Sequence, residues 1–140
     1  MTQSAATRSL VIEREMPHPP EKVWRALTEG GLIEQWLMKN DFRPVVGHRF
    51  QFRMTPVQGW DGVIDGEALV VEPYDRLSYT WSTMGTTLVV TWTLTPTEGG
   101  VLLRMEQSGF GPEQEREYQG ANYGWQKFIG ALEGVVAGLD

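Results

Sequence analysis

The sequence predicts an α+β fold in which a strongly curved, six-stranded antiparallel sheet wraps around one long C-terminal helix, with two short helices between strands one and two. Apolar and polar residues alternate over residues 48–110, with turn residues at intervals of about ten, which is typical of an antiparallel meander. The period becomes helical over 113–139. Because 140 residues is the size of one compact domain, we expect residues 1–140 to form a single domain.

The first strand is expected over 9–16, since this alternating stretch ends at a run of prolines. Proline at the start and Glu21 in the first turn predict a short amphipathic helix over 20–27. Two glycines at 30–31 break that helix, and the apolar spacing over 32–37 predicts a second short helical segment.

Five further strands complete the predicted sheet, and each presents one apolar face. They are expected at 49–54, 62–73, 77–82, 87–94 and 101–106. In the second of these five, Gly66 is expected to mark a β-bulge. The last helix, over 113–139, is on the order of 40 Å long at about 1.5 Å per residue, so it is able to cross the whole sheet.

Composition restricts the classes of function. The 18 acidic and 12 basic residues give a net charge of −6, which disfavours nucleic acid and anionic membranes as partners. The chain contains no cysteine, so disulfides, thiolate metal sites and cysteine nucleophiles are excluded. No apolar stretch approaches the roughly 20 residues of a membrane span and no signal peptide is evident, so a cytoplasmic location is expected.

Several segments, in their order and spacing, resemble a known superfamily. They are VWRALT at 23–28, IEQW at 33–36, EP at 72–73, RLSYTW at 76–81, VTWTL at 90–94, and GW at 124–125 with Leu132. Over about 9–139 the chain resembles the START-like (SRPBCC) superfamily, and within it the family related to the activator of the heat-shock protein 90 ATPase. The resemblance implies a helix-grip fold with a hydrophobic cavity for lipids, sterols, polyketides or plant hormones, and some members are cyclases or hydroxylase subunits.

Aromatic and large apolar residues on the inward faces are candidates for lining such a cavity, because Trp and Tyr combine an apolar wall with a polar edge. The alternative, which we expect for more than half of these side chains, is that they fill a close-packed core. Tyr79, Trp81, Trp92 and Tyr123 are the leading candidates for the lining. The full set of candidate ligand-binding residues is Trp36 and Phe42 at the entrance, with Phe50, Phe52, Met54, Tyr79, Trp81, Val90, Trp92, Leu103, Met105, Tyr118, Tyr123, Trp125 and Phe128 inside.

Catalytic candidates are Asp65, Glu67 and Tyr79. If the strand face that carries the two carboxylates is concave, desolvation would raise their pKa and suit general acid or base catalysis. The favoured alternative is that a bulge at Gly66 turns both carboxylates to solvent. His18 and His48 have no neighbour at metal-ligand spacing, so neither a metal nor another cofactor is expected.

Three functions are therefore compared. The first is binding of a small hydrophobic or amphipathic molecule between sheet and helix. The second is a protein-interaction module, either a co-chaperone with a chaperone partner or a stress-associated protein, acting as a monomer or homodimer. The third is a cyclase- or hydrolase-type enzyme. Ligand binding is preferred, and an enzyme ranks last.

Overall fold

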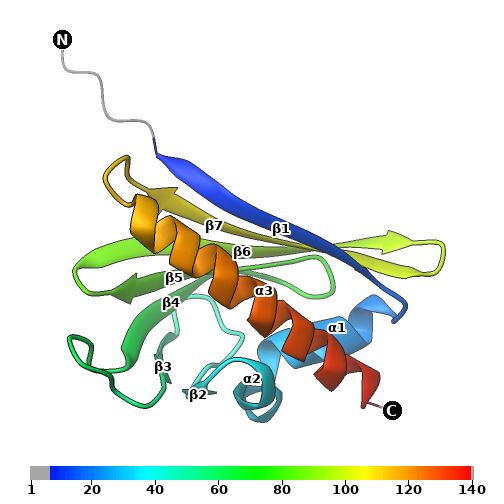
Figure 1. The fold of residues 1–140 in the computed structure, drawn as a ribbon. Coiled ribbons are helices and arrows are strands. Elements are labelled where there is room, and N and C mark those ends of the chain that lie inside the picture. The colour runs from blue at the N-terminus through cyan, green and yellow to red at the C-terminus, as the bar shows by residue number, and fades with distance from the viewer. Residues whose placement is uncertain (1–6, 140) are drawn as a thin grey trace.

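The computed structural model describes residues 7–139 and shows an α+β fold with one antiparallel sheet and three helices (Figure 1). The strands are β1 (Arg8–Met16), β2 (Lys39–Asn40), β3 (Arg49–Arg53), β4 (Val63–Glu72), β5 (Arg76–Thr83), β6 (Thr86–Thr97) and β7 (Gly100–Phe110). The helices are α1 (Pro20–Thr28), α2 (Gly30–Trp36) and α3 (Glu115–Ala137). The strand order is β1-β7-β6-β5-β4-β3-β2, so the N-terminal strand lies beside the last one.

The sheet of the described residues has seven strands, so the expectation of six is wrong by one. The additional strand, β2, has only two residues and pairs with Phe52 and Arg53 of β3. A pair of residues is too short to show an alternation of apolar and polar side chains. The two short helices do lie between β1 and β2.

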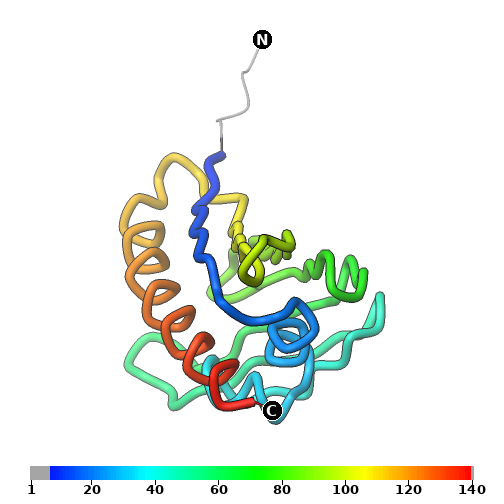
Figure 2. Tube along the Cα trace, turned by 90° about the vertical axis from the view of Figure 1, so that its right-hand side faces the viewer, coloured from blue at the N-terminus to red at the C-terminus, as the bar shows by residue number. Residues whose placement is uncertain are grey.

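Helix α3 lies along one face of the curved sheet, and α1 and α2 lie near the C-terminal end of α3 (Figure 2). Helix α1 starts with Pro20 at its first position, where the missing N–H is not needed, and Glu21 complements the helix dipole. Val23, Ala26 and Leu27 share its buried face. The side chain of Trp36 in α2 donates a 2.8 Å hydrogen bond to the Ala26 carbonyl and so joins the two short helices.

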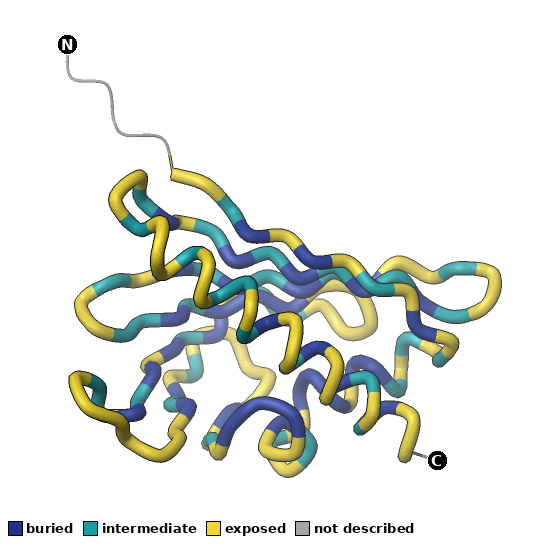
Figure 3. The backbone as a smooth tube through the Cα atoms, in the orientation of Figure 1, coloured by how far each residue is buried: buried dark blue, intermediate teal, exposed yellow. Residues whose placement is uncertain are grey.

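The core lies between the sheet and the helices, and the burial pattern alternates along the strands (Figure 3). Trp92 of β6 is at its centre and contacts Trp36 and Trp125 edge to face, with ring centroids 5.7 Å apart in both pairs. Edge-to-face pairs add to the free energy gained by apolar burial. The centre of this interior is therefore filled by packed side chains.

Two register shifts re-aim side chains in the sheet. In β4 the register against β5 shifts between Ala68 and Val70, so the bulge lies at Leu69 rather than at the expected Gly66. In β7 the pairing with β1 shifts at Gly109, whose φ of 106° favours glycine. This second bulge turns Phe110 to the buried side.

Gly66 has a packing role instead. It pairs with Phe50 of β3, and a Cβ atom at Gly66 would lie 2.5 Å from Phe50 Cζ and 2.8 Å from the Thr80 carbonyl oxygen. Only glycine leaves room for the Phe50 ring to lie against the β4 backbone.

Candidate functional site

The two halves of α3 differ in how they meet the sheet. Trp125, Ile129, Leu132 and Val136 are buried, and all of them lie in the C-terminal part of the helix. No residue over 115–124 is buried. The N-terminal half therefore stands away from the sheet and leaves a gap. The helix residues that face this gap include the small Gly120, Ala121 and Gly124.

The gap contains two adjoining spaces. The larger, of about 250 Å³, is lined by Trp81, Thr83, Met84, Thr86, Leu88, Gln107, Phe110, Gln114, Glu117 and Ala121. The smaller one, of about 170 Å³, is lined by Trp81, Gln107, Gly120, Ala121, Gly124, Trp125 and Phe128. Trp81, Gln107 and Ala121 belong to both linings, so we describe the two spaces together as the helix–sheet cavity. Its walls are mostly apolar with a few polar groups, which is the usual character of a small-molecule site.

Gln107 is the buried polar residue of this cavity. It occupies an inward position of β7, between Leu10 of β1 and Val90 of β6, and it is 2% exposed. Its Oε1 accepts a 2.8 Å hydrogen bond from Trp125 Nε1 on α3. Buried polar groups are nearly always hydrogen-bonded, and the Gln107 oxygen meets this requirement through Trp125 of the helix.

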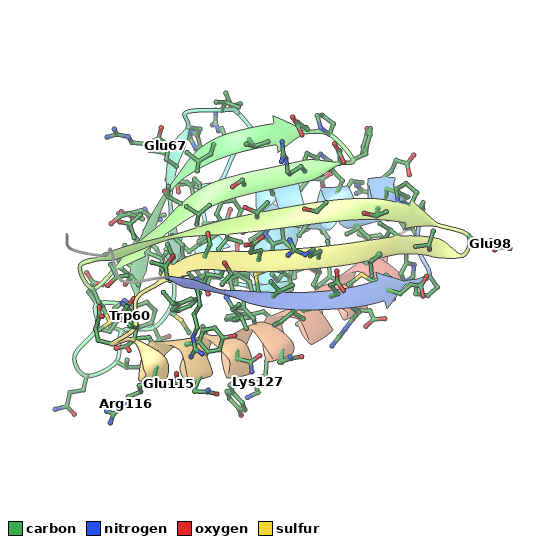
Figure 4. The ribbon with its side chains drawn as sticks, turned by 90° about the horizontal axis from the view of Figure 1, so that it is seen from above. Trp60, Glu67, Glu98, Glu115, Arg116 and Lys127 are labelled. Carbon is green, nitrogen blue, oxygen red and sulfur yellow. The ribbon has the colours of Figure 1, made fainter. Side chains whose placement is uncertain are left out.

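Polar residues also form the outer rim of the helix–sheet cavity. Gln114 precedes α3, accepts a hydrogen bond from the Gly111 backbone N–H at 2.7 Å and donates to Thr86 Oγ1 at 3.3 Å. Thr83 accepts a 2.8 Å hydrogen bond from Trp60 Nε1. Figure 4 shows Trp60 at the same end of the molecule as the first turn of α3. The loop that carries Trp60 is thereby attached to the rim.

Only a minority of the sequence-predicted ligand-binding residues reach this cavity. Trp81, Trp125 and Phe128 line the helix–sheet cavity. Most of the others are buried in packed contacts and do not line it, and these are Trp36, Phe42, Phe50, Phe52, Tyr79, Val90, Trp92, Leu103 and Met105. Tyr118 is half-buried, and its ring packs edge to face on Phe110.

Met54 and Tyr123 correct the expectation that both point inward. Met54 follows β3, is 45% exposed and lines an open depression at the sheet edge with Met38 and Lys39. Tyr123 is 67% exposed on the outer face of α3, where the Lys127 ammonium lies 4.9 Å from its ring centroid. Successive residues of an α-helix are about 100° apart around its axis, so Tyr123, two positions before the buried Trp125, faces the opposite side.

The catalytic candidates do not meet in this cavity. Asp65 and Glu67 lie on the outer face of the sheet, in an open groove of about 420 Å³ that Arg49 and Gln51 also line. Gln51 donates to Asp65 at 2.9 Å, and Arg49 and Glu67 are 3.8 Å apart, so these groups partner one another. Figure 4 shows Glu67 on the side of the sheet away from α3.

Tyr79 is buried in the core. Its hydroxyl accepts a 3.0 Å hydrogen bond from Trp92 Nε1. Burial raises the pKa of the Tyr79 phenol well above its ordinary value, and the Trp92 hydrogen bond only partly opposes this effect. The side chain is therefore a neutral structural partner for Trp92 at physiological pH.

Sequence reasoning missed Gln107 because the predicted strand ended at Glu106. Val101, Leu103 and Met105 alternate inward, and one further step of the same alternation reaches Gln107. That signal was present in the sequence. Phe110 could not be found in this way, since the bulge at Gly109 reverses the alternation.

Within residues 7–139, no group of three or more His, Asp or Glu side chains is arranged to hold a metal ion. Over the same residues, no helix combines the length and apolar character needed to cross a bilayer.

The curved sheet that grips a terminal helix, together with a cavity between them, defines the class of START-like proteins. A family model described as "Activator of Hsp90 ATPase homolog 1-like protein" matches residues 17–137. The chain therefore belongs to this family. No curated protein sequence matches the chain.

Solved structures agree with this assignment. Protein MLL2253 from Mesorhizobium loti is 52% identical over 95% of this chain and 99% of its own, with a TM-score of 0.87. CalU16 from Micromonospora echinospora is 25% identical over 94% of this chain and 78% of its own, with a TM-score of 0.76. DynU16, a protein in the dynemicin biosynthetic locus, is 27% identical with a TM-score of 0.79; the match covers 93% of this chain and 47% of DynU16.

Proposed function

We propose that this protein binds a small hydrophobic or amphipathic molecule in the helix–sheet cavity. The observation that carries the proposal is the separation of the N-terminal half of α3 from the sheet, which leaves lined spaces of about 250 Å³ and 170 Å³ in an otherwise packed interior. Close-packed interiors contain few voids larger than a water molecule. Apolar walls from Trp81, Leu88 and Phe110 would hold such a ligand by burial of its surface.

Two further observations support ligand binding. Each space is smaller than the roughly 300–1,000 Å³ of drug-sized sites, so the two fit a small molecule rather than a long lipid. DynU16, whose structure is similar to this one, lies in a locus for biosynthesis of dynemicin. That context concerns a small molecule, and it is consistent with this proposal.

The competing functions have less support in the geometry. An enzyme based on Asp65, Glu67 and Tyr79 would need these groups in the cavity, whereas the carboxylates lie on the outer face and Tyr79 is occupied by Trp92. A chaperone-binding role has no specific surface in its favour among the described residues. Ligand binding is therefore the function that the site supports best.

Filling the cavity tests the proposal. Ala121 lines both spaces, so Ala121→Phe should occupy them and abolish binding. Ala131→Phe makes the same change at an exposed position of the same helix and serves as the matched control. A panel of small neutral aromatic and aliphatic compounds is titrated against both variants and the wild type by thermal shift. A ligand present at 100 times its Kd should raise the stability of the wild type and of Ala131→Phe by about 2.7 kcal/mol.

Two outcomes would contradict the proposal. If no compound raises the melting temperature of the wild type, the proposal fails. If a compound stabilises Ala121→Phe as much as the wild type, it binds elsewhere, and the helix–sheet cavity is not the site.

A further inference from the structure

The polar chemistry of the cavity specifies the kind of ligand more narrowly. We propose that the ligand is an uncharged or cationic molecule with an acceptor oxygen, such as a ketone carbonyl, and that this oxygen receives a hydrogen bond from the Gln107 side-chain amide. This inference rests on the proposed function, because it names the ligand class for the same site.

The orientation of the Gln107 amide is fixed by its neighbour. An indole N–H is only a donor, so the atom that faces Trp125 Nε1 at 2.8 Å must be the amide oxygen. The amide nitrogen then points the other way. Trp125 is itself buried against Trp81, with ring centroids 5.1 Å apart, which holds the indole in place.

The Gln107 Nε2 group has no hydrogen-bond acceptor among residues 7–139, although the residue as a whole is only 2% exposed. Gln107 lines both spaces of the helix–sheet cavity, so its NH₂ group is a donor that the two spaces share, whereas Thr83, Thr86 and Gln114 line only the larger space. Thr97 Oγ1 is the one fully buried side-chain polar atom without a partner among the described residues, so Gln107 Nε2 is not sealed off and its NH₂ group is reachable from the cavity. A ligand acceptor atom would satisfy it while the ligand's apolar part packs on Trp81.

The charges around the cavity determine what else the ligand can carry. Glu117 is the ionisable residue of the lining, and neither an arginine nor a lysine of the described chain belongs to it. A carboxylate on the ligand would therefore lack a cationic partner in the cavity, and burying an unpaired charge is unfavourable. The net charge of −6 acts in the same direction. A positive or neutral group at the rim would instead be compatible with Glu117.

Three probes of matched shape separate these contributions: 2-acetylnaphthalene, 2-ethylnaphthalene and 2-naphthoate. Their Kd values are measured by calorimetry on the full chain at pH 7. The variant Gln107→Met removes the donor, and Gln126→Met makes the same change at an exposed position of α3 as a control. Unfolding curves establish that each variant is folded before it is titrated.

One neutral hydrogen bond corresponds to roughly a three- to tenfold change in affinity. We expect the ratio of affinities for the ketone over the ethyl compound to fall by that factor in Gln107→Met and to stay unchanged in Gln126→Met. The carbonyl stretching frequency of bound 2-acetylnaphthalene should be lower in the wild type than in Gln107→Met. 2-Naphthoate should bind at least about tenfold more weakly than the ketone, since its charge finds no partner.

Different failures have different meanings. If the affinity ratio and the carbonyl frequency are the same in the wild type and Gln107→Met, Gln107 does not recognise the ligand, while the proposed function stands. If 2-naphthoate binds as tightly as the ketone, the restriction on charge is wrong. If none of the three probes binds the wild type, the proposed function fails together with this inference.

Discussion

Replacing Gly66 by alanine tests the packing of the sheet against Phe50. The backbone of Gly66 does not have a positive φ, so alanine introduces no backbone strain there. The whole effect is steric, because the new Cβ would lie 2.5 Å from Phe50 Cζ, 2.7 Å from Phe50 Cε2 and 2.8 Å from the Thr80 carbonyl oxygen. Ordinary contacts between such atoms are about 3.5–4.0 Å, so the atoms must move by about 1 Å.

Neither neighbour can move freely. The Phe50 ring is held by Phe42 at 4.9 Å and by Phe52 at 5.1 Å between centroids, and the Thr80 oxygen belongs to the β5 backbone. Overpacking of this kind costs about 1–3 kcal/mol, and the lower entropy of the unfolded alanine chain returns about 0.4–1 kcal/mol. We expect a net loss of about 1–2 kcal/mol, or roughly 4–8 °C in melting temperature for a chain of this size.

The assay is urea unfolding and thermal melting of Gly66→Ala beside Gly134→Ala. A Cβ at Gly134, in the last turns of α3, meets nothing within 4 Å, so that variant should be neutral or more stable by up to about 1 kcal/mol. Phe50→Leu should partly rescue Gly66→Ala, because it removes the nearest atoms. If Gly66→Ala is as stable as the wild type, the close approach of Phe50 to the β4 backbone is not a real constraint.

Three other predictions concern single side chains. Tyr79→Phe leaves a buried tryptophan N–H without its acceptor and should cost about 1–3 kcal/mol in urea unfolding. Burial raises the pKa of Tyr79 in the folded state, so the contribution of this group to stability is present below about pH 10 and is lost as the pH rises further. The free energy of unfolding should therefore fall less between pH 10 and higher pH in Tyr79→Phe than in the wild type. Equal falls in the two proteins would contradict this. Leu132→Ala, at a fully buried position of α3, should cost about 2–5 kcal/mol, and a loss below 1 kcal/mol would mean that the helix is not anchored there. Arg14→Met breaks the partly exposed Arg14–Glu133 pair and should cost at most about 1 kcal/mol in low salt, and the difference from the wild type should shrink at high salt; a difference that stays the same in high salt would mean that the pair contributes through packing rather than charge.

Regular elements of the fold were predictable from the sequence because each shows a repeated pattern. The alternation in β5, β6 and β7 and the apolar face of α3 follow from the periods of strand and helix. β2 was not predictable, since two residues have no period. The bulge at Leu69 was misplaced to Gly66 because glycine is common at bulges, while here it accommodates Phe50.

The site was less predictable than the fold. Aromatic residues were expected to line a cavity, but Trp92 and its neighbours fill the interior, since the sequence does not give the separation between helix and sheet. Small residues that line the gap, such as Ala121, show no pattern in the sequence that would mark it. Gln107 was within reach of sequence reasoning, as a polar residue that continues an apolar alternation.

The division of α3 into a buried C-terminal part and a lifted N-terminal part affects how the protein can change. Substitutions at Leu132 or Val136 alter the folding free energy, whereas positions such as Glu117 and Ala121 bury little surface. Under the proposed function, new ligand preferences can therefore arise by mutation at one end of the helix while stability is maintained by the other. The trade-off between acquiring a specificity and staying folded is correspondingly weak in this architecture.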